Sequence, residues 1–194
     1  MPERMSFLVD SSNSLLGSAS CILNQIEDEG GKKDPNKFAY ILVASASLES
    51  ILNDGIVNWA YNTFPKDDYK RHATAFLAMS LRGKLDSIGY LTTKGKYITD
   101  NSSNMYQGLS KLISLRNEVA HSKDFFIEAD VEFTNDSEGN RSMSLPHEVI
   151  SKFEKSPLAL SNEYLLTIYE YLYELNQTLK GEIQYESARL IKTI

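Results

Sequence analysis

The chain has 194 residues, of which 42% are hydrophobic and 24% are charged, and its formal net charge is −6. This length and composition predict a single globular domain over residues 1–194, and the negative charge argues against general binding of nucleic acid through a broad basic surface. The single cysteine, Cys21, excludes an intrachain disulfide. The N-terminus is unlike a signal peptide, and no apolar run approaches membrane-spanning length. We therefore expect a cytoplasmic protein without a membrane contact.

Three helices are predicted in the first half of the chain, because apolar residues recur there at intervals of three and four. A Gly-Gly-Lys-Lys-Asp-Pro segment at 30–35 separates the first helix from the second, and Pro65 separates the second from the third. A polar loop at 92–104 follows, in which Ser102 or Ser103 can cap the next helix. The three predicted helices span about residues 10–28, 36–61 and 67–91.

The fourth predicted helix, at 105–121, carries the most informative residues of the chain, Arg116, Asn117 and His121. At about 100° per residue, Arg116 projects into the middle of an apolar arc, whereas Asn117 and His121 lie one turn apart on its shoulder. An arginine in an apolar arc is costly unless it is paired, so another helix or another subunit is expected to supply a partner. The arc consists of Leu109, Leu112, Ile113, Leu115, Val119 and Ala120.

Two other predicted helices also carry one charged residue within an apolar arc. Glu49 lies in the arc of the second helix, and Lys84 lies in the arc of the third. One negative and two positive charges would then point toward packing faces. The pattern therefore predicts a shared polar cluster of Glu49, Lys84 and Arg116.

A β-hairpin is predicted as an insert after the motif helix, at about 124–145. Residues 125–133 are rich in aromatic and β-branched side chains, 135–140 are a strong turn signal, and 141–145 can return as the partner strand. A lone hairpin is marginal in water, so this one is expected to pack on the bundle or on a second subunit.

Two further helices complete the predicted all-α bundle. A short helix is expected at 147–155, and a long C-terminal helix is expected at about 161–189. The long helix has a narrow leucine-rich seam, for which packing within its own bundle is favoured over dimerisation.

The motif residues suit the cleavage of RNA by attack of its 2′-hydroxyl, which needs a base, an acid and a cation at the phosphate. His121 can serve as base or acid, Arg116 can hold the phosphate, and Asn117 can orient the phosphate or the imidazole. One chain offers a single suitable histidine, since His72 and His147 are expected to be structural or surface residues. A two-fold dimer would bring a second His121 and a second Arg116 to the same cleft, so we expect a homodimer.

An RNA site on a chain of this charge would need a local basic rim. The alternative for each candidate is an ordinary surface charge. The candidates are Lys66, Lys70 and Arg71 at the start of the third helix, Lys94 and Lys96 in the loop before the motif helix, and Lys123 just after His121. The sequence has no Cys/His cluster for zinc and no glycine-rich phosphate loop, so neither a metal nor a cofactor is predicted.

The segment Arg116-Asn117-x-x-x-His121 resembles the R-x(4–6)-H motif of the HEPN superfamily, the higher-eukaryote and prokaryote nucleotide-binding domains. Residues 46–52, Ala-Ser-Leu-Glu-Ser-Ile-Leu, are similar to the glutamate-bearing helix of that family. The resemblance covers the helical core through His121 and, more loosely, the last helix. It implies an all-α bundle that often dimerises with its motifs facing each other. The predicted hairpin after His121 departs from the family pattern.

Catalytic members of this family are metal-independent endoribonucleases, and many are toxins or defence proteins. The favoured function is therefore a HEPN-type endoribonuclease that cleaves RNA as a homodimer. The alternative is a non-catalytic HEPN-like module that binds nucleotide, RNA or protein and partners an antitoxin or a nucleotidyltransferase. A third is a helical interaction protein whose motif only stabilises the fold. The intact motif favours the first function, and the negative charge favours the other two.

Overall fold

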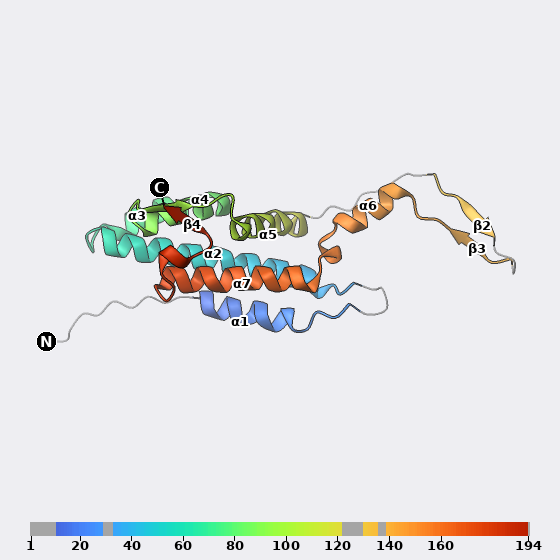
Figure 1. Ribbon diagram of the computed structural model, residues 1–194, viewed down its shortest axis with the longest axis horizontal. Coiled ribbons are helices and arrows are strands. Elements are labelled where there is room, and N and C mark those ends of the chain that lie inside the picture. Colours follow the sequence, from blue (N-terminus) through green and yellow to red (C-terminus); the bar gives the residue numbers. More distant parts are fainter. Residues whose placement is uncertain (1–10, 29–32, 122–129, 136–138, 194) are drawn as a thin grey trace.

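The computed structural model describes residues 11–28, 33–121, 130–135 and 139–193, which form seven α-helices and four short strands. The predicted all-α class is confirmed. The helices make an elongated bundle, and a thinner arm extends from one end of it (Figure 1). The elements are α1 (Ser12–Leu23), α2 (Asn36–Thr63), α3 (Tyr69–Leu77), α4 (Leu81–Thr92), β1 (Tyr97–Thr99), α5 (Asn104–Ala120), β2 (Phe133–Asn135), β3 (Arg141–Met143), α6 (His147–Lys155), the 3-10 turn η1 (Pro157–Ala159), α7 (Asn162–Lys180), the 3-10 turn η2 (Tyr185–Ser187) and β4 (Ile191–Thr193).

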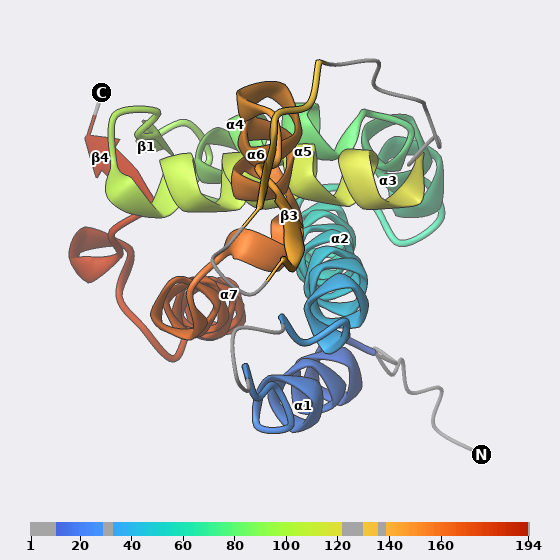
Figure 2. The same cartoon turned by 90° about the vertical axis from the view of Figure 1, so that its right-hand side faces the viewer.

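The longest helix, α2, is the centre of the bundle. It packs against α1, α3, α4, α5 and α7, which Figure 2 shows arranged around it. By length and mean hydropathy α2 would also qualify as a membrane span, which the sequence analysis did not anticipate, but 56% of that stretch is buried inside the bundle. Its apolar residues thus form the core, including Tyr40, Ile41, Ala44, Leu48, Ile51, Leu52, Ile56 and Ala60.

The single helix predicted at 67–91 is in fact two helices. α3 ends at Leu77 and α4 begins at Leu81, and between them the Ser80 hydroxyl accepts a hydrogen bond from the Gly83 backbone N–H at 3.1 Å. This cap stabilises a new helix start, because it satisfies one of the backbone donors that an N-terminus leaves open. Apolar residues keep their helical spacing across the break, so periodicity alone did not reveal it.

The long C-terminal helix ends earlier than predicted. α7 stops at Lys180, and Gly181 follows in the left-handed conformation at φ +80°, which glycine adopts without steric cost. The chain then turns back, and β4 pairs antiparallel with β1, so that Tyr97 lies opposite Thr193. The leucine-rich seam packs within its own bundle, as predicted, with Leu165, Ile168, Leu172 and Leu175 buried.

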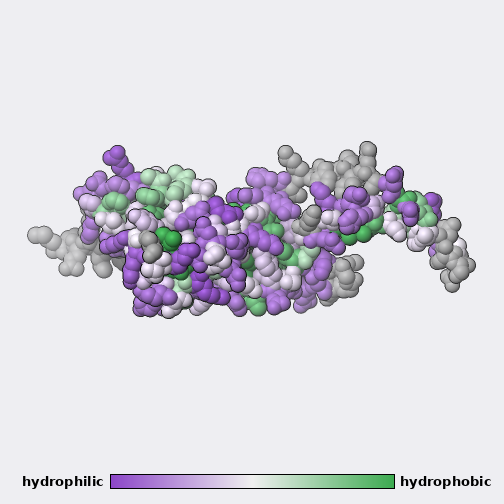
Figure 3. Space-filling view, turned by 45° about the horizontal axis from the view of Figure 1, so that its top comes forward, coloured by the Kyte–Doolittle hydropathy of each residue, from purple (hydrophilic) through white to green (hydrophobic). Residues whose placement is uncertain are grey.

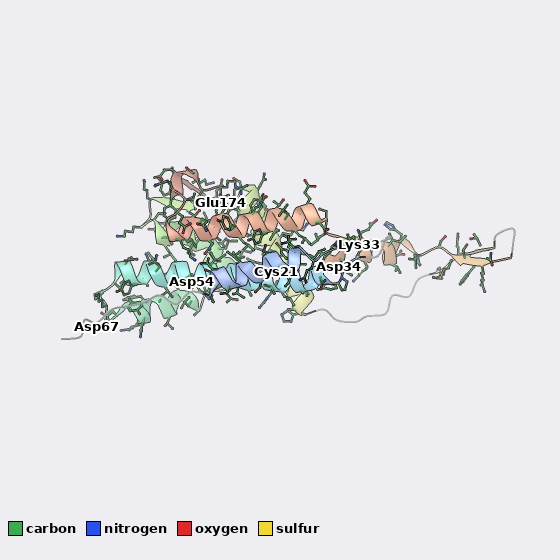
Figure 4. All side chains as sticks on the ribbon, turned by 90° about the horizontal axis from the view of Figure 1, so that it is seen from below. Cys21, Lys33, Asp34, Asp54, Asp67 and Glu174 are labelled. Carbon is green, nitrogen blue, oxygen red and sulfur yellow. The ribbon has the colours of Figure 1, made fainter. Side chains whose placement is uncertain are left out.

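A buried lysine ties the start of α2 to the segment that precedes α7. The Lys37 side chain is fully buried, and its ammonium donates to Asp28 Oδ2 at 2.8 Å and to the carbonyl oxygens of Leu158 and Leu160 at 3.2 and 2.8 Å. The hydrogen bond from Lys37 holds the pKa of the Asp28 carboxyl well below its usual range. Figure 4 shows the neighbouring Lys33 and Asp34 at this end of the bundle.

The arm, which we define as the described residues between 130 and 155, contains β2, β3 and α6. The predicted hairpin is partly confirmed: β2 and β3 pair antiparallel, while most of the predicted first strand lies outside the described residues. α6 has the predicted bounds. The described part of the hairpin extends away from its own bundle (Figure 1). The expectation that it packs on this bundle is therefore wrong.

Replacing Lys37 by methionine should lower the free energy of unfolding by about 3 kcal/mol, because two carbonyl oxygens and a carboxylate lose their buried donor. Urea unfolding near neutral pH measures the change. Lys33→Met is the matched control: Lys33 also pairs with Asp28, at 3.1 Å, but its side chain is 49% exposed, so its loss should cost less than about 0.5 kcal/mol. An equal loss in the free energy of unfolding for the two substitutions would contradict a stabilising role of the buried Lys37 ammonium.

Candidate functional site

The motif lies in the last two turns of α5, a helix that crosses over α7 and α2 (Figure 2). Ser103 caps the start of α5, as predicted, since its hydroxyl accepts a hydrogen bond from the Tyr106 N–H at 3.1 Å. Gly108 allows a close crossing of α7, because a Cβ at that position would lie 2.8 Å from Cε2 of Tyr171. The first half of α5 is therefore held directly on α7.

Two polar contacts fix α5 against α4. Arg82 Nη2 donates to the carbonyl oxygen of Ser110 at 3.0 Å, and the Tyr106 hydroxyl donates to Asp86 Oδ1 at 2.7 Å. The hydrogen bond to Asp86 raises the pKa of the Tyr106 hydroxyl, because it favours the protonated phenol. These contacts were not predicted, since polar side chains on outward faces give no periodic signal.

The C-terminal end of α5 extends past α2 in Figure 2, and its side chains are correspondingly exposed. Leu115 is the last buried residue of the helix, and beyond it Val119 is half-buried. Arg116, Asn117 and His121 are all exposed on this free end. The structure thus brings the three predicted catalytic residues together on one surface.

Asn117 links the other two motif residues. Arg116 Nη1 donates to Asn117 Oδ1 at 3.1 Å, and the backbone N–H of His121, the C-cap of the helix, donates to the Asn117 carbonyl oxygen at 3.0 Å. A guanidinium has five N–H donors, so a hydrogen bond to one amide oxygen still permits bidentate binding of a phosphate. The Asn117 amide therefore orients the guanidinium of Arg116 and leaves its other N–H groups available to a phosphate.

Arg116 does not join the polar cluster predicted with Glu49 and Lys84. Within the described ranges it forms no ion pair with Glu49, and its side chain lies at the surface. Helical periodicity placed Arg116 in line with the apolar arc, but the arc continues beyond the point where α2 covers it. Periodicity describes a single helix and does not reveal where a neighbouring helix stops.

The other two members of that cluster do pair. Lys84 on α4 is buried, and its ammonium donates to Asn53 Oδ1 at 2.8 Å and lies 3.5 Å from Glu49 Oε1. Glu49 and Asn53 are one turn apart on α2, so both can face one ammonium. The contact fastens α4 to α2. Asn53 was missed because a neutral amide does not stand out in an apolar pattern as a charge does.

Lys94 and Lys96 lie at the opposite end of α5 from the motif. Both belong to the turn between α4 and β1, where Lys94 has a φ of +54° and Lys96 pairs with Glu186 at 3.0 Å. Figure 2 shows β1 at the N-terminal side of α5, so most of this 17-residue helix, about 25 Å long, separates these lysines from His121. Lys94 and Lys96 therefore do not border the motif, their contact with RNA stays a prediction, and Lys123 lies outside the described residues.

The other two histidines lie on helices other than the motif helix. The His72 ring on α3 stacks on Phe64, with centroids 3.7 Å apart, and His147 is exposed at the start of α6. Their expected structural and surface placements are confirmed. Among the residues that the structure describes, no group of three or more His, Cys, Asp or Glu side chains is arranged to hold a metal ion.

Comparison of the chain with protein-family models, with curated proteins and with solved structures finds no significant match. Its function is therefore inferred from the geometry and chemistry of the motif.

Arg116→Ala should leave the free energy of unfolding within about 0.5 kcal/mol of wild type, because the guanidinium is exposed. Lys84→Ala should instead cost about 2–3 kcal/mol, since it removes a buried side chain and leaves Asn53 without its ammonium partner. Urea unfolding of both variants gives the comparison. A large loss of stability in Arg116→Ala would indicate that Arg116 belongs to the cluster expected with Glu49 and Lys84. It would contradict a surface site.

Proposed function

We propose that the chain is a metal-independent endoribonuclease of the HEPN type, acting on RNA as a homodimer. The observation that carries the proposal is the joint exposure of Arg116, Asn117 and His121 on the free end of α5. The competing view, that the motif only stabilises the fold, required Arg116 to be paired inside the bundle. Its exposed position leaves that view without its main support.

In the proposed reaction, one His121 imidazole removes the proton from a ribose 2′-hydroxyl, and the 2′-oxygen attacks the adjacent phosphorus. The bond from phosphorus to the 5′-oxygen breaks, and that oxygen takes a proton from a second histidine. The products are a 2′,3′-cyclic phosphate and a free 5′-hydroxyl. Arg116 binds the non-bridging phosphate oxygens as negative charge develops, and Asn117 keeps the guanidinium in place.

The need for a second histidine supports a dimer. One protomer supplies one motif histidine, and His72 and His147 are placed elsewhere. An exposed face of α2 also offers a contact surface: Ala39, Leu42 and Ala46 are spaced three and four apart and are exposed. We call these three residues the α2 stripe. A two-fold contact there would set two motifs close together.

The second candidate function is a non-catalytic HEPN-like module that binds nucleotide, RNA or protein beside an antitoxin or a nucleotidyltransferase. The net charge of −6 and the remote position of Lys94 and Lys96 favour it, because both leave the motif with less positive potential than a nuclease ordinarily presents to RNA. An assay of cleavage decides between the two.

The purified protein should cleave mixed RNA in the presence of a chelator, and His121→Ala should reduce the rate at least about 100-fold, because a group that transfers the proton is lost. His147→Ala is the matched control and should retain the wild-type rate. Since His121 and His147 are both exposed, neither substitution should change the melting temperature by more than about 2 °C. Cleavage is followed by gel electrophoresis of end-labelled RNA.

The nature of the products gives a second readout of the same reaction. A 2′-deoxy substitution at the scissile nucleotide should block cutting, because the attacking group is the 2′-hydroxyl itself. Cutting of the deoxy substrate, or cleavage that depends on added magnesium, would contradict this mechanism. An inactive wild type on varied RNAs would favour the binding module.

A further inference from the structure

A pocket that the motif does not use lies at the C-terminal end of α2. The last turns of α2, the turn between α4 and β1, the end of α7 and the 3-10 turn η2 meet around it, and its volume is about 100 Å³. It opens to solvent and has both polar and apolar walls. We call it the Trp59 pocket, and the lining side chains that matter below are Asn58, Trp59, Asn62, Lys94 and Tyr185.

Two aromatic side chains line this pocket. Trp59 is the only tryptophan of the chain, and its edge-on contacts with Phe64 and Phe76, at centroid distances of 5.4 and 4.9 Å, hold the indole in place. Both Trp59 and Tyr185 are half-buried, so part of each remains accessible. Hydrophilic side chains cover much of the face that Figure 3 shows, and an aromatic lining open to solvent differs from such a surface.

Two side-chain amides, one turn apart on α2, give the pocket a polar edge. Asn62 Nδ2 donates to the carbonyl oxygen of Asn58 at 2.8 Å and to Asn58 Oδ1 at 2.9 Å. These bonds use the donor of one amide and the acceptor of the other. Among the described residues, Asn62 Oδ1 and Asn58 Nδ2 have no hydrogen bond, so an acceptor and a donor remain side by side. The polar edge of a nucleobase presents the complementary pair.

Lys94 supplies a positive charge at the pocket. It is exposed, and within the described part of the chain it forms no ion pair, whereas Lys96 is paired with Glu186 at 3.0 Å. Its φ of +54° is the left-handed conformation that glycine adopts without steric cost and lysine rarely adopts. Residues held in such a conformation occur preferentially at functional sites. The Lys94 ammonium is therefore available to an anion such as phosphate.

We propose that the Trp59 pocket binds a pyrimidine base of single-stranded RNA, with Lys94 on the adjoining phosphate. The inference rests on the proposed function, because it takes RNA as the ligand. Proteins hold single-stranded RNA by stacking its bases on aromatic side chains, by hydrogen bonds to the base edges and by cations along the backbone. The pocket combines all three kinds of group.

The volume of the pocket favours the smaller bases. A protein cavity of about 150 Å³ holds one benzene ring. A pocket of about 100 Å³ that opens to solvent therefore accepts a single six-membered ring, with the ribose outside, more readily than the two fused rings of a purine.

The pocket would hold the substrate at a distance from the bond that is cleaved. Most of α5, about 25 Å long, separates Lys94 from His121. Several nucleotides of an extended strand are needed to span that distance. The proposed nuclease would then recognise a pyrimidine several nucleotides away from its cleavage point.

The test is a fluorescence titration of the single tryptophan with short oligonucleotides, in the full chain carrying His121→Ala so that the RNA stays intact. Stacking of a base on Trp59 should quench the fluorescence. Oligouridylate should bind at least about tenfold more tightly than oligoadenylate if the pocket selects one ring. An open aromatic surface would give the reverse order, because a purine stacks over a larger area.

Lys94→Gly tests the cation without disturbing the fold. Glycine suits the left-handed conformation, so the melting temperature should not fall. The dissociation constant for oligouridylate should nevertheless rise at least about fivefold, and the slope of its logarithm against the logarithm of salt concentration should decrease by about 0.7, the value for one phosphate contact. Lys96→Ala is the matched control, which removes a neighbouring paired charge and should change the constant less than about twofold.

Three results would overturn the inference: no quenching by any oligonucleotide, equal affinity for oligouridylate and oligoadenylate, or equal effects of Lys94→Gly and Lys96→Ala. The proposed nuclease fails separately. Cleavage of RNA by a wild type that binds both oligonucleotides equally would keep the enzyme and remove the pocket. Binding of oligouridylate by a wild type that leaves RNA intact would keep the pocket and favour the binding module.

Discussion

The crossing of α5 over α7 and α2 is the constraint on which the candidate site depends. Gly108 makes the close crossing possible, because a side chain there would meet the Tyr171 ring at 2.8 Å. A helix of 17 residues that starts over α7 extends past α2, so in its last turn Val119 still packs on the core while Asn117, Glu118 and Ala120 are exposed. The exposed surface of Arg116, Asn117 and His121 is the direct consequence of this geometry.

Burial distinguishes the long cationic side chains that stabilise the fold from the one that belongs to the candidate site. Lys37 and Lys84 are buried, and the ammonium of each donates to at least one oxygen at 2.8 Å, which holds another segment against α2. Arg116 also follows an apolar arc, yet it is exposed and hydrogen-bonded only to its neighbour among the described residues. A cation in an apolar arc therefore stabilises helix packing only where a neighbouring helix extends far enough to cover it.

Signals that act over a few residues were the most predictable from the sequence. The cap at Ser103 and the bounds of α6 follow from local chemistry, and the pairing of Glu49 with Lys84 follows from two misplaced charges. The break at Ser80 and the end of α7 at Gly181 are local too, but continuous apolar spacing on both sides concealed them. Hydrophobic periodicity outweighed the capping residues in each case.

Features that depend on distant segments were not predictable in the same way. β1 and β4 are three residues each and lie more than 90 positions apart, too short for periodicity and too far for a turn signal. Whether Arg116 is buried depends on how far α2 extends beneath α5, and whether Lys94 borders the site depends on which end of α5 it occupies. Both are facts of helix packing, which a single sequence does not display.

The proposed reaction needs two histidines, and the motif of one chain supplies one, so the proposal depends on a second copy of the chain. The most direct measurement is the rate of RNA cleavage per protomer as the protein is diluted through its dimer-to-monomer transition, with the dimer fraction determined by sedimentation in the same buffer. A shared site predicts a rate per protomer that falls in proportion to the dimer fraction. A rate per protomer that stays constant once the protein is monomeric, or no cleavage by the dimer, would contradict it.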